Sequence, residues 1–180
     1  QQAVAAASSD PQAGSLPTAV NDLSPGNWNI DLVDAERVWS ALGISGQGAV
    51  VAGFDTGVEY THPALNDNYR GNLGLNQYDH NYSWFAPDPN LYPDGNLGRS
   101  VSDEPADCDY FGTHGTHTMG TMVGRNDSSS FEGATDIGMA PNARWIAVPG
   151  ICFDTMPGDL GDDIGGLKAF QWLLCPTDLS

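Results

Sequence analysis

An aspartate placed directly after an apolar run is the first candidate for chemistry in this sequence. Asp55 follows the run 49–54 and precedes Thr56-Gly57. A continuous apolar run of this length is typical of a strand buried on both faces of a parallel sheet, and open α/β sheets bind ligands at the carboxyl ends of their strands. Asp55 is therefore placed either to orient a catalytic base or, as the simpler alternative, to form a turn at a strand end.

A histidine at the expected start of a helix is the second candidate. His114 opens the motif His114-Gly115-Thr116-His117, and mostly small residues continue it to Val123. The positive end of a helix dipole disfavours a charged imidazole, so His114 is suited to act as a neutral general base. The alternatives are a capping or core histidine, or a metal site on His114 and His117. Zinc would need a third ligand, and the sequence has no HExxH pattern.

Together the two motifs resemble the Asp and His signatures of the subtilisin-like serine proteases, the subtilase family. The matching segments are Asp55-Thr56-Gly57-Val58, His62-Pro63-Ala64-Leu65, His114-Gly115-Thr116-His117-Thr118-Met119-Gly120-Thr121, and Gly138-Met139-Ala140-Pro141-Asn142-Ala143 with Trp145-Ile146-Ala147-Val148. The resemblance runs over roughly residues 28 to 175, in the family's order. Within the family, the run 170–174 with Pro176-Thr177-Asp178-Leu179 looks most like the bacillopeptidase F branch.

The resemblance implies a role for each candidate. Asp55 would hold the imidazole of His114 in the right tautomer and stabilise its cation, and His114 would take the proton of a serine and return it to the leaving amine. His117 would be structural, within a buried helix. The implied activity is that of a secreted, extracellular serine endopeptidase that acts on proteins or peptides through an acyl-enzyme and needs no cofactor for its chemistry.

The nucleophile half of the family pattern is not found in these 180 residues. There is no Gly-Thr-Ser-Met-Ala type segment and no Gly-x-Ser-x-Gly elbow, and the family's oxyanion-hole Asn belongs to a later segment. An Asp–His pair without its serine retains little of the triad's acceleration. We therefore expect the N-terminal part of a catalytic domain, inactive alone, whose complementary C-terminal part brings the serine and the oxyanion hole. The alternative is an inactive fragment or pseudoprotease that acts as a binding module.

The elements that must position the two residues alternate between strands and helices. The expected elements are a helix at 35–42 with Asp34 as N-cap and Gly43 as stop, a strand at 49–54, a helix at 114–123, a strand at 144–148 and a helix at 164–174. This alternation implies a parallel sheet with right-handed crossovers. With the resemblance, it predicts an α/β fold, the N-terminal portion of a subtilisin-like three-layer fold with a parallel sheet flanked by helices.

Two segments stand apart from these elements. Residues 1–26, rich in Ala, Ser, Gln and Pro, predict a disordered linker or a pro-segment remnant, which leaves 27–180 as the incomplete catalytic domain. The segment 66–110 is a long polar and aromatic loop, and because such loops are uncommon in compact domains we expect it to be functional or locally packed. The loop between Leu65 and His114 is about twice the family's usual length, which favours either a lid or rim over the cleft or a stabilising insertion.

The resemblance also implies a substrate-binding edge strand at Gly158, Asp159, Leu160 and Gly161, which would pair with the substrate backbone. Four Asp residues lie between positions 154 and 163, and we expect them to favour basic substrate side chains two to four residues before the cleaved bond. Their alternative role is to cap the following helix. A structural calcium ion is compatible with the Asp-rich loops, although Ala64 stands where the family often has a calcium-binding Asp.

Composition excludes some classes of function. Six basic against 23 acidic residues give a net charge of −17, which argues against nucleic-acid binding because phosphate neutralisation needs basic patches. The longest apolar run, 49–54, is far too short to span a membrane. Cys108, Cys152 and Cys175 lack metal-ligand spacing. In an extracellular protein we expect a Cys108–Cys152 disulfide, with Cys175 bonded to the missing segment; buried free thiols are the alternative.

Overall fold

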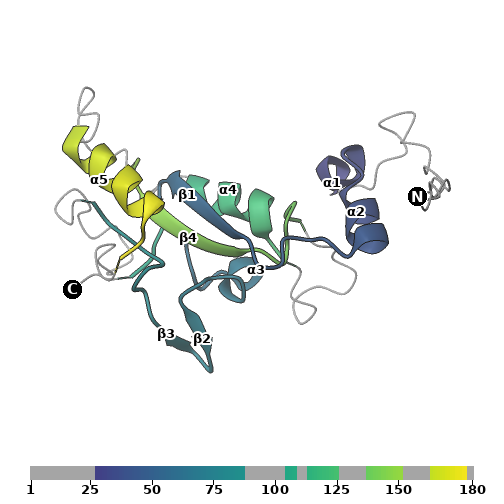
Figure 1. Cartoon of the computed structure of the whole chain (residues 1–180), viewed down its shortest axis with the longest axis horizontal. Helices are drawn as coiled ribbons and strands as arrows, with labels where there is room; N and C mark the ends of the chain where they lie inside the picture. Colours follow the sequence, from purple (N-terminus) through teal and green to yellow (C-terminus); the bar gives the residue numbers. More distant parts are fainter. Residues whose placement is uncertain (1–26, 88–103, 109–112, 126–136, 152–162, 178–180) are drawn as a thin grey trace, which may run out of the picture.

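The computed structural model describes residues 27–87, 104–108, 113–125, 137–151 and 163–177 (Figure 1). Its elements are α1 (Trp28–Leu32), α2 (Ala35–Leu42), β1 (Val50–Asp55), α3 (Pro63–Asn66), β2 (Asn72–Gly74), β3 (Gln77–Tyr78), α4 (His114–Val123), β4 (Arg144–Pro149) and α5 (Asp163–Leu174). None of these described helices is long and apolar enough to cross a membrane. The predicted linker at 1–26 and the predicted substrate strand at 158–161 lie outside the described residues.

A parallel pair of strands forms the centre of the fold. β1 and β4 pair from Val50 opposite Arg144 to Asp55 opposite Pro149, and α4 lies between them in the sequence. Because the strands are parallel, both stop at the same end of the sheet, called its carboxyl edge below. Asp55 is the last residue of β1 at this end. This strand–helix–strand unit confirms the α/β class, and each strand lies within one residue of its predicted range.

Successive residues of β4 point to opposite faces, and this alternation builds a helical layer on each side of the sheet. On one face Trp145 belongs to a core cluster with Met119 of α4. On the other face Ile146 belongs to a second cluster with Trp172 of α5. All of β4 after Arg144 is buried. The parallel sheet flanked by helices is therefore confirmed.

The second edge of β4 is covered by part of the segment that the sequence presented as a long loop. Isolated bridges pair Tyr69 with Trp145 and Trp84 with Ala147, and the aromatic rings of Tyr69 and Trp145 lie 4.5 Å apart between centroids. Tyr69 and Trp84 are fully buried, and the β2–β3 hairpin separates them in the chain. Local packing is confirmed for residues 66–87, while 88–103 lie outside the described residues.

A histidine inside this aromatic packing stays uncharged at neutral pH. Nδ1 of His80 lies 3.0 Å from the hydroxyl of Tyr69, and Tyr60 and Tyr78 contribute further ring contacts. Burial lowers the pKa of His80 below its usual value and outweighs the nearby acidic groups, which act to raise it. Burial also raises the pKa of the Tyr69 phenol. The 66–87 segment therefore packs on the sheet through neutral rings.

β1 is much more exposed than its partner strand. Val50 keeps 49% of its surface exposed and Ala52 is also exposed, so the prediction of a strand buried on both faces is wrong for the described residues. The physical reason is the position of the strand. Among those residues β1 has β4 as its one strand partner, and its other edge is uncovered.

The helix boundaries follow local signals with one correction. α2 has the predicted range and ends at Gly43, whose φ of +66° is the left-handed conformation expected of a glycine stop. Asp34 occupies the N-cap position as predicted, although its side chain makes no capping bond in the described chain and its carboxylate instead pairs with Arg37. The sequence reading missed α3, which begins where Nδ1 of His62 accepts the N–H of Ala64 at 3.2 Å.

The turn after β1 is packed so closely that it requires glycine. Gly57 has a φ of +97°, and a Cβ there would overlap the carbonyl oxygen of Ala106. A Cβ at Gly115 would in turn overlap the carbonyl oxygen of Gly57. Three backbones therefore meet at this point: the β1 turn, the first turn of α4 and the segment 104–108.

We expect Gly57→Ala to lower the free energy of unfolding by about 3 kcal/mol, since it adds a backbone collision to an unfavourable positive φ. Gly48→Ala is the matched control: its φ is +80° but no atom lies within 4 Å of the added methyl, so only about 1 kcal/mol should be lost. Chemical denaturation of both variants measures the difference. Equal losses would show that the three-way backbone contact is not tight.

Candidate active site

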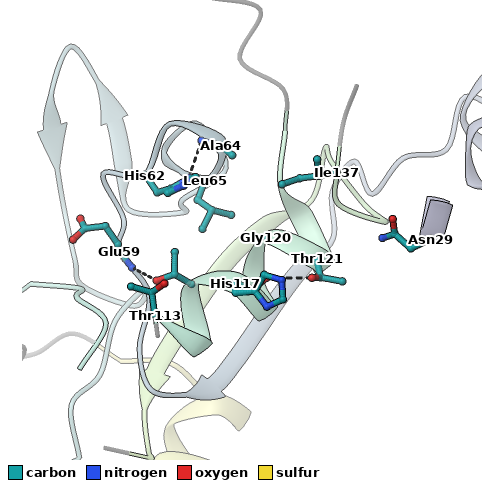
Figure 2. Close-up of a pocket in the computed structure, with 11 residues that line it drawn as sticks. Asn29, Glu59, His62, Ala64, Leu65, Thr113, His117, Gly120, Thr121 and Ile137 are labelled. Atoms are coloured by element: carbon teal, nitrogen blue, oxygen red, sulfur yellow. Dashed lines mark hydrogen bonds between the residues drawn. The ribbon is translucent and has the colours of Figure 1, made fainter. Parts of the chain in front are cut away.

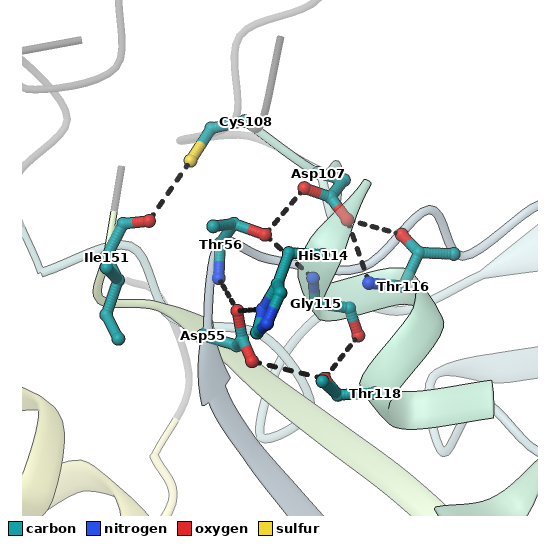
Figure 3. A network of polar contacts seen from close by, with 9 residues as sticks. All are labelled: Asp55, Thr56, Asp107, Cys108, His114, Gly115, Thr116, Thr118 and Ile151. Carbon is teal, nitrogen blue, oxygen red and sulfur yellow. Dashed lines mark hydrogen bonds and ion pairs between the residues drawn. The ribbon is translucent and has the colours of Figure 1, made fainter. Parts of the chain in front are cut away.

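The two predicted catalytic residues lie in direct contact at the carboxyl edge of the sheet (Figure 3). Asp55 ends β1 and His114 begins α4. Nδ1 of His114 lies 2.7 Å from Oδ1 of Asp55. The Asp55 side chain is 18% exposed and the His114 side chain 61%, so a shielded carboxylate holds an imidazole that faces solvent.

The contact assigns the tautomer of the imidazole. A carboxylate can only accept hydrogen bonds, so Nδ1 of His114 is the nitrogen that carries the proton in the Asp55 contact. In the neutral ring Nε2 is then the basic nitrogen. His114 is therefore arranged to accept a proton from a nucleophile through Nε2, while Asp55 stabilises the cation that results.

Asp55 is held in its ionised form by hydrogen bonds. Burial by itself raises its pKa, but the bond to His114, the N–H of Thr56 and the hydroxyl of Thr118 outweigh burial and lower the pKa below its usual value. The Thr56 N–H donates to Oδ1 at 2.7 Å, and the Thr118 hydroxyl donates to Oδ2 at 3.1 Å. Asp55 therefore remains negative throughout the neutral range, where it can orient His114.

The first turn of α4 takes its hydrogen-bond acceptors from other segments. Thr113 stands at the N-cap with a φ of +52°, and within the described part of the chain its side chain makes no capping bond. The N–H of Gly115 instead donates to the hydroxyl oxygen of Thr56 at 2.8 Å, and the N–H of Thr116 to Asp107 at 2.8 Å. The sequence reading did not single out Thr56, Asp107 or Thr118. Only the adjacency of Thr56 to Asp55 was a signal, because Asp107 is one of many Asp residues in a polar loop.

His117 does not lie where the sequence predicted. Its side chain is exposed in the described part of the chain, not buried, and with Thr121 it lines a cavity of about 460 Å³ beside α4 (Figure 2). Glu59 and His62 also line this cavity. Nevertheless, no group of three or more His, Cys, Asp or Glu side chains among the described residues is placed to hold a metal ion.

The chain leaves β4 directly beside the Asp–His pair. The N–H groups of Gly150 and Ile151 both donate to the carbonyl oxygen of Asp55, at 2.8 and 3.0 Å. The predicted substrate-binding residues Gly158, Asp159, Leu160 and Gly161 follow in a stretch that lies outside the described residues. The last described residue before that stretch, Ile151, lies beside Asp55.

Two of the three cysteines, Cys108 and Cys175, lie among the described residues. Sγ of Cys108 lies 3.9 Å from the carbonyl oxygen of Ile151, the residue before Cys152, and Cys152 itself lies outside the described residues. Cys175 is an exposed free cysteine.

Comparisons with known proteins agree with this geometry. A family model described as the subtilase family matches residues 46–171. Bacillopeptidase F of Bacillus subtilis (strain 168) is 39% identical over 153 residues, which cover 84% of this chain and 9% of that protein. The minor extracellular protease Vpr of the same strain is 33% identical over 115 residues, 64% of this chain and 11% of the relative.

A more distant relative comes from an animal. Neuroendocrine convertase 2 of Caenorhabditis elegans is 30% identical over 119 residues, which cover 66% of this chain and 15% of that protein. The aligned part of this chain thus spans less than a sixth of the length of each of these three relatives.

We expect Thr118→Val to raise the pKa of Asp55, because it removes one hydrogen bond that favours the carboxylate. A group with a depressed pKa stabilises the fold at neutral pH, and this contribution is lost as the pH falls through that pKa. The Asp55-linked stability difference between Thr118→Val and the unmodified protein should therefore shrink on acidification. Carbon-13 NMR titration of the Asp55 carboxyl measures the shift.

The control is Thr121→Val on the same helix. It makes the same chemical change, but the Thr121 hydroxyl donates to the carbonyl oxygen of His117 at 3.2 Å and not to Asp55. The titration of Asp55 should be unchanged in this variant. An unshifted titration in Thr118→Val as well would refute the role assigned to the Thr118 hydroxyl.

Proposed function

The chain belongs to the subtilase family, and on this premise we propose that it forms the Asp–His part of the catalytic site of a serine endopeptidase. The observation that carries the proposal is the 2.7 Å contact between Asp55 and Nδ1 of His114 at the carboxyl edge of a parallel sheet. In this function His114 accepts the proton of a serine hydroxyl as the serine attacks the scissile carbonyl. It then gives the proton to the leaving amine, while Asp55 stabilises the imidazolium.

The serine and the oxyanion hole come, in this proposal, from a complementary C-terminal part of the catalytic domain. Two features of the described residues support such a part. The outer edge of β1 is uncovered, with Val50 49% exposed, and α5 presents Leu167, Phe170 and Leu174 with 59, 56 and 89% of their surfaces exposed. Burial of apolar surface and pairing of an open strand edge are the usual means by which a further layer is added to a sheet.

Substrate binding is assigned to the stretch that follows β4. Gly158, Asp159, Leu160 and Gly161 would pair with the backbone of a protein or peptide substrate as an added strand, and the neighbouring Asp residues would favour basic side chains. The position of Ile151 beside Asp55 supports this assignment, since the stretch begins at the site. The chemistry requires no cofactor, and a structural calcium ion would serve stability alone.

Secretion is part of the same proposal, and it bears on the cysteines. One relative is described as an extracellular protease, and a secreted domain favours disulfides over free thiols. We assign a bond between Cys108 and Cys152, supported by the 3.9 Å separation of the Cys108 sulfur from Ile151. Cys175, which is exposed, is then available to the complementary part.

A serine-directed fluorophosphonate applied to the full-length protein tests the activity. We expect covalent labelling of one serine outside residues 1–180, which peptide mass spectrometry would locate, together with hydrolysis of a protein substrate. His114→Ala should lower kcat/KM by about 10⁴-fold or more, because the triad members act as a unit.

His62→Asn is the matched control for the histidine substitution. Asparagine is a good helix N-cap, so this variant keeps the cap of α3, and it should retain wild-type activity. A folded full-length protein that neither labels nor hydrolyses would instead favour the alternative of a binding module.

Peptide mapping without reduction tests the cysteine assignment. We expect a cross-linked peptide pair containing Cys108 and Cys152, which separates into two peptides after reduction. Cys175 should cross-link to a peptide from outside the chain. A Cys108–Cys175 pair, or alkylation of Cys108 without prior reduction, would contradict the assignment.

A further inference from the structure

The segment 104–108, called the strap below, lies across the end of β1 and the first turn of α4 (Figure 3). Asp107 forms an antiparallel bridge with Gly57, and the N–H of Cys108 donates to the carbonyl oxygen of Thr56 at 2.8 Å. The strap therefore contacts the residues that directly follow Asp55. It does so by backbone bonds, which fix its position on the turn.

The strap places a buried carboxylate between the strand and the helix. Asp107 keeps only 8% of its surface exposed. Its Oδ1 accepts the hydroxyl of Thr56 at 2.7 Å, and its Oδ2 accepts both the N–H of Thr116 at 2.8 Å and the hydroxyl of Thr116 at 2.6 Å. One oxygen thus bonds the residue next to Asp55, and the other bonds the helix that begins with His114.

The Asp107 side chain replaces a cap that the N-cap residue of α4 does not supply. The first N–H groups of a helix need acceptors from outside the helix, and a carboxylate is favoured there by the helix dipole. Thr113 does not provide a side-chain cap among the described contacts. Asp107 accepts the Thr116 N–H directly, and it orients the Thr56 hydroxyl whose oxygen accepts the Gly115 N–H at 2.8 Å.

We propose that Asp107 is a positioning residue that sets the placement of His114 relative to Asp55. It touches neither reacting atom. It acts by joining the Thr56 side chain to the first turn of α4, so that the Nδ1–Oδ1 contact is held before substrate binds. This inference rests on the proposed endopeptidase function, since a placement matters for rate only where His114 is the base.

The test is Asp107→Asn in the full-length enzyme. An amide has one acceptor oxygen where the carboxylate has two, so it cannot accept from both the Thr56 hydroxyl and the Thr116 groups, and one of these links is lost. With kcat normalised by active-site titration with the fluorophosphonate, we expect kcat to fall about 10- to 100-fold. KM should stay within about threefold, because the substrate contacts are untouched.

Two further readouts separate positioning from general destabilisation. A weaker bond from Asp55 stabilises the imidazolium less, so the acidic limb of the kcat/KM profile should move to lower pH. The proton NMR signal of the His114 Nδ1–H should also move upfield. A substitution that only reduces the folded fraction would change neither of these values per titrated site.

Glu104→Gln is the matched control on the same strap. Its carboxylate accepts the hydroxyl of Tyr60 at 3.1 Å, away from α4, and a glutamine oxygen can accept the same bond. This variant should match the unmodified enzyme in kcat, in the acidic limb and in the Nδ1–H signal.

The outcomes distinguish this inference from the proposed function. Wild-type kcat per site with an unmoved acidic limb in Asp107→Asn overturns the inference, provided that His114→Ala is inactive. Retained activity in His114→Ala overturns the function itself, and with it the inference.

Should Asp107→Asn not fold, Thr56→Val replaces it, because that change removes the hydroxyl link but keeps both Asp107 bonds to Thr116. The same fall in kcat and shift of the limb are then required, and wild-type values contradict the proposal.

Discussion

The contact between the turn after β1 and the first turn of α4 is the constraint on which the site depends. Gly57 and Gly115 have no side chains, and a Cβ at Gly115 would overlap the Gly57 carbonyl oxygen. The helix can therefore begin directly above the end of the strand. The residues beside these glycines, Asp55 and His114, inherit their separation from the backbone. This close backbone contact holds the two residues near each other before substrate binds, which is the structural meaning of preorganisation.

The electrostatics of the site follow from the same contact. Carboxylates stand near the amino end of α4, where the helix dipole favours negative charge. Asp55 accepts bonds from an N–H, a hydroxyl and an imidazole, and Asp107 accepts bonds from hydroxyls and an N–H. Although the chain has a net charge of −17, these carboxylates are stabilised by fixed dipoles. Fixed dipoles need no reorganisation when His114 gains a proton.

The sheet is unequally covered among the described residues. One edge of β4 is bonded by the 66–87 segment, which packs through the neutral rings of Tyr69 and His80. The outer edge of β1 has no such cover, and its side chains are correspondingly exposed. Two largely apolar strands therefore differ in burial, with β4 buried and β1 half-exposed. Burial depends on what lies beside a strand, not on its own hydrophobicity.

By itself the sequence determined the features that depend on neighbouring residues. The apolar runs, the small residues after His114 and the Gly43 stop predicted β1, β4, α4 and α2 nearly to the residue, and the motifs around Asp55 and His114 indicated both members of the pair. Only the tertiary structure decided which distant groups support them. Thr118 and Asp107 carry no local signal for their roles, and Thr56 carries only its adjacency to Asp55, because each role is a contact with a residue 9 to 63 positions away. The exposure of His117 and the packing of 66–87 were likewise decided by how the chain folds back on itself. Periodicity and capping act within a few residues, whereas these contacts exist only once the strand end, the helix end and the strap meet.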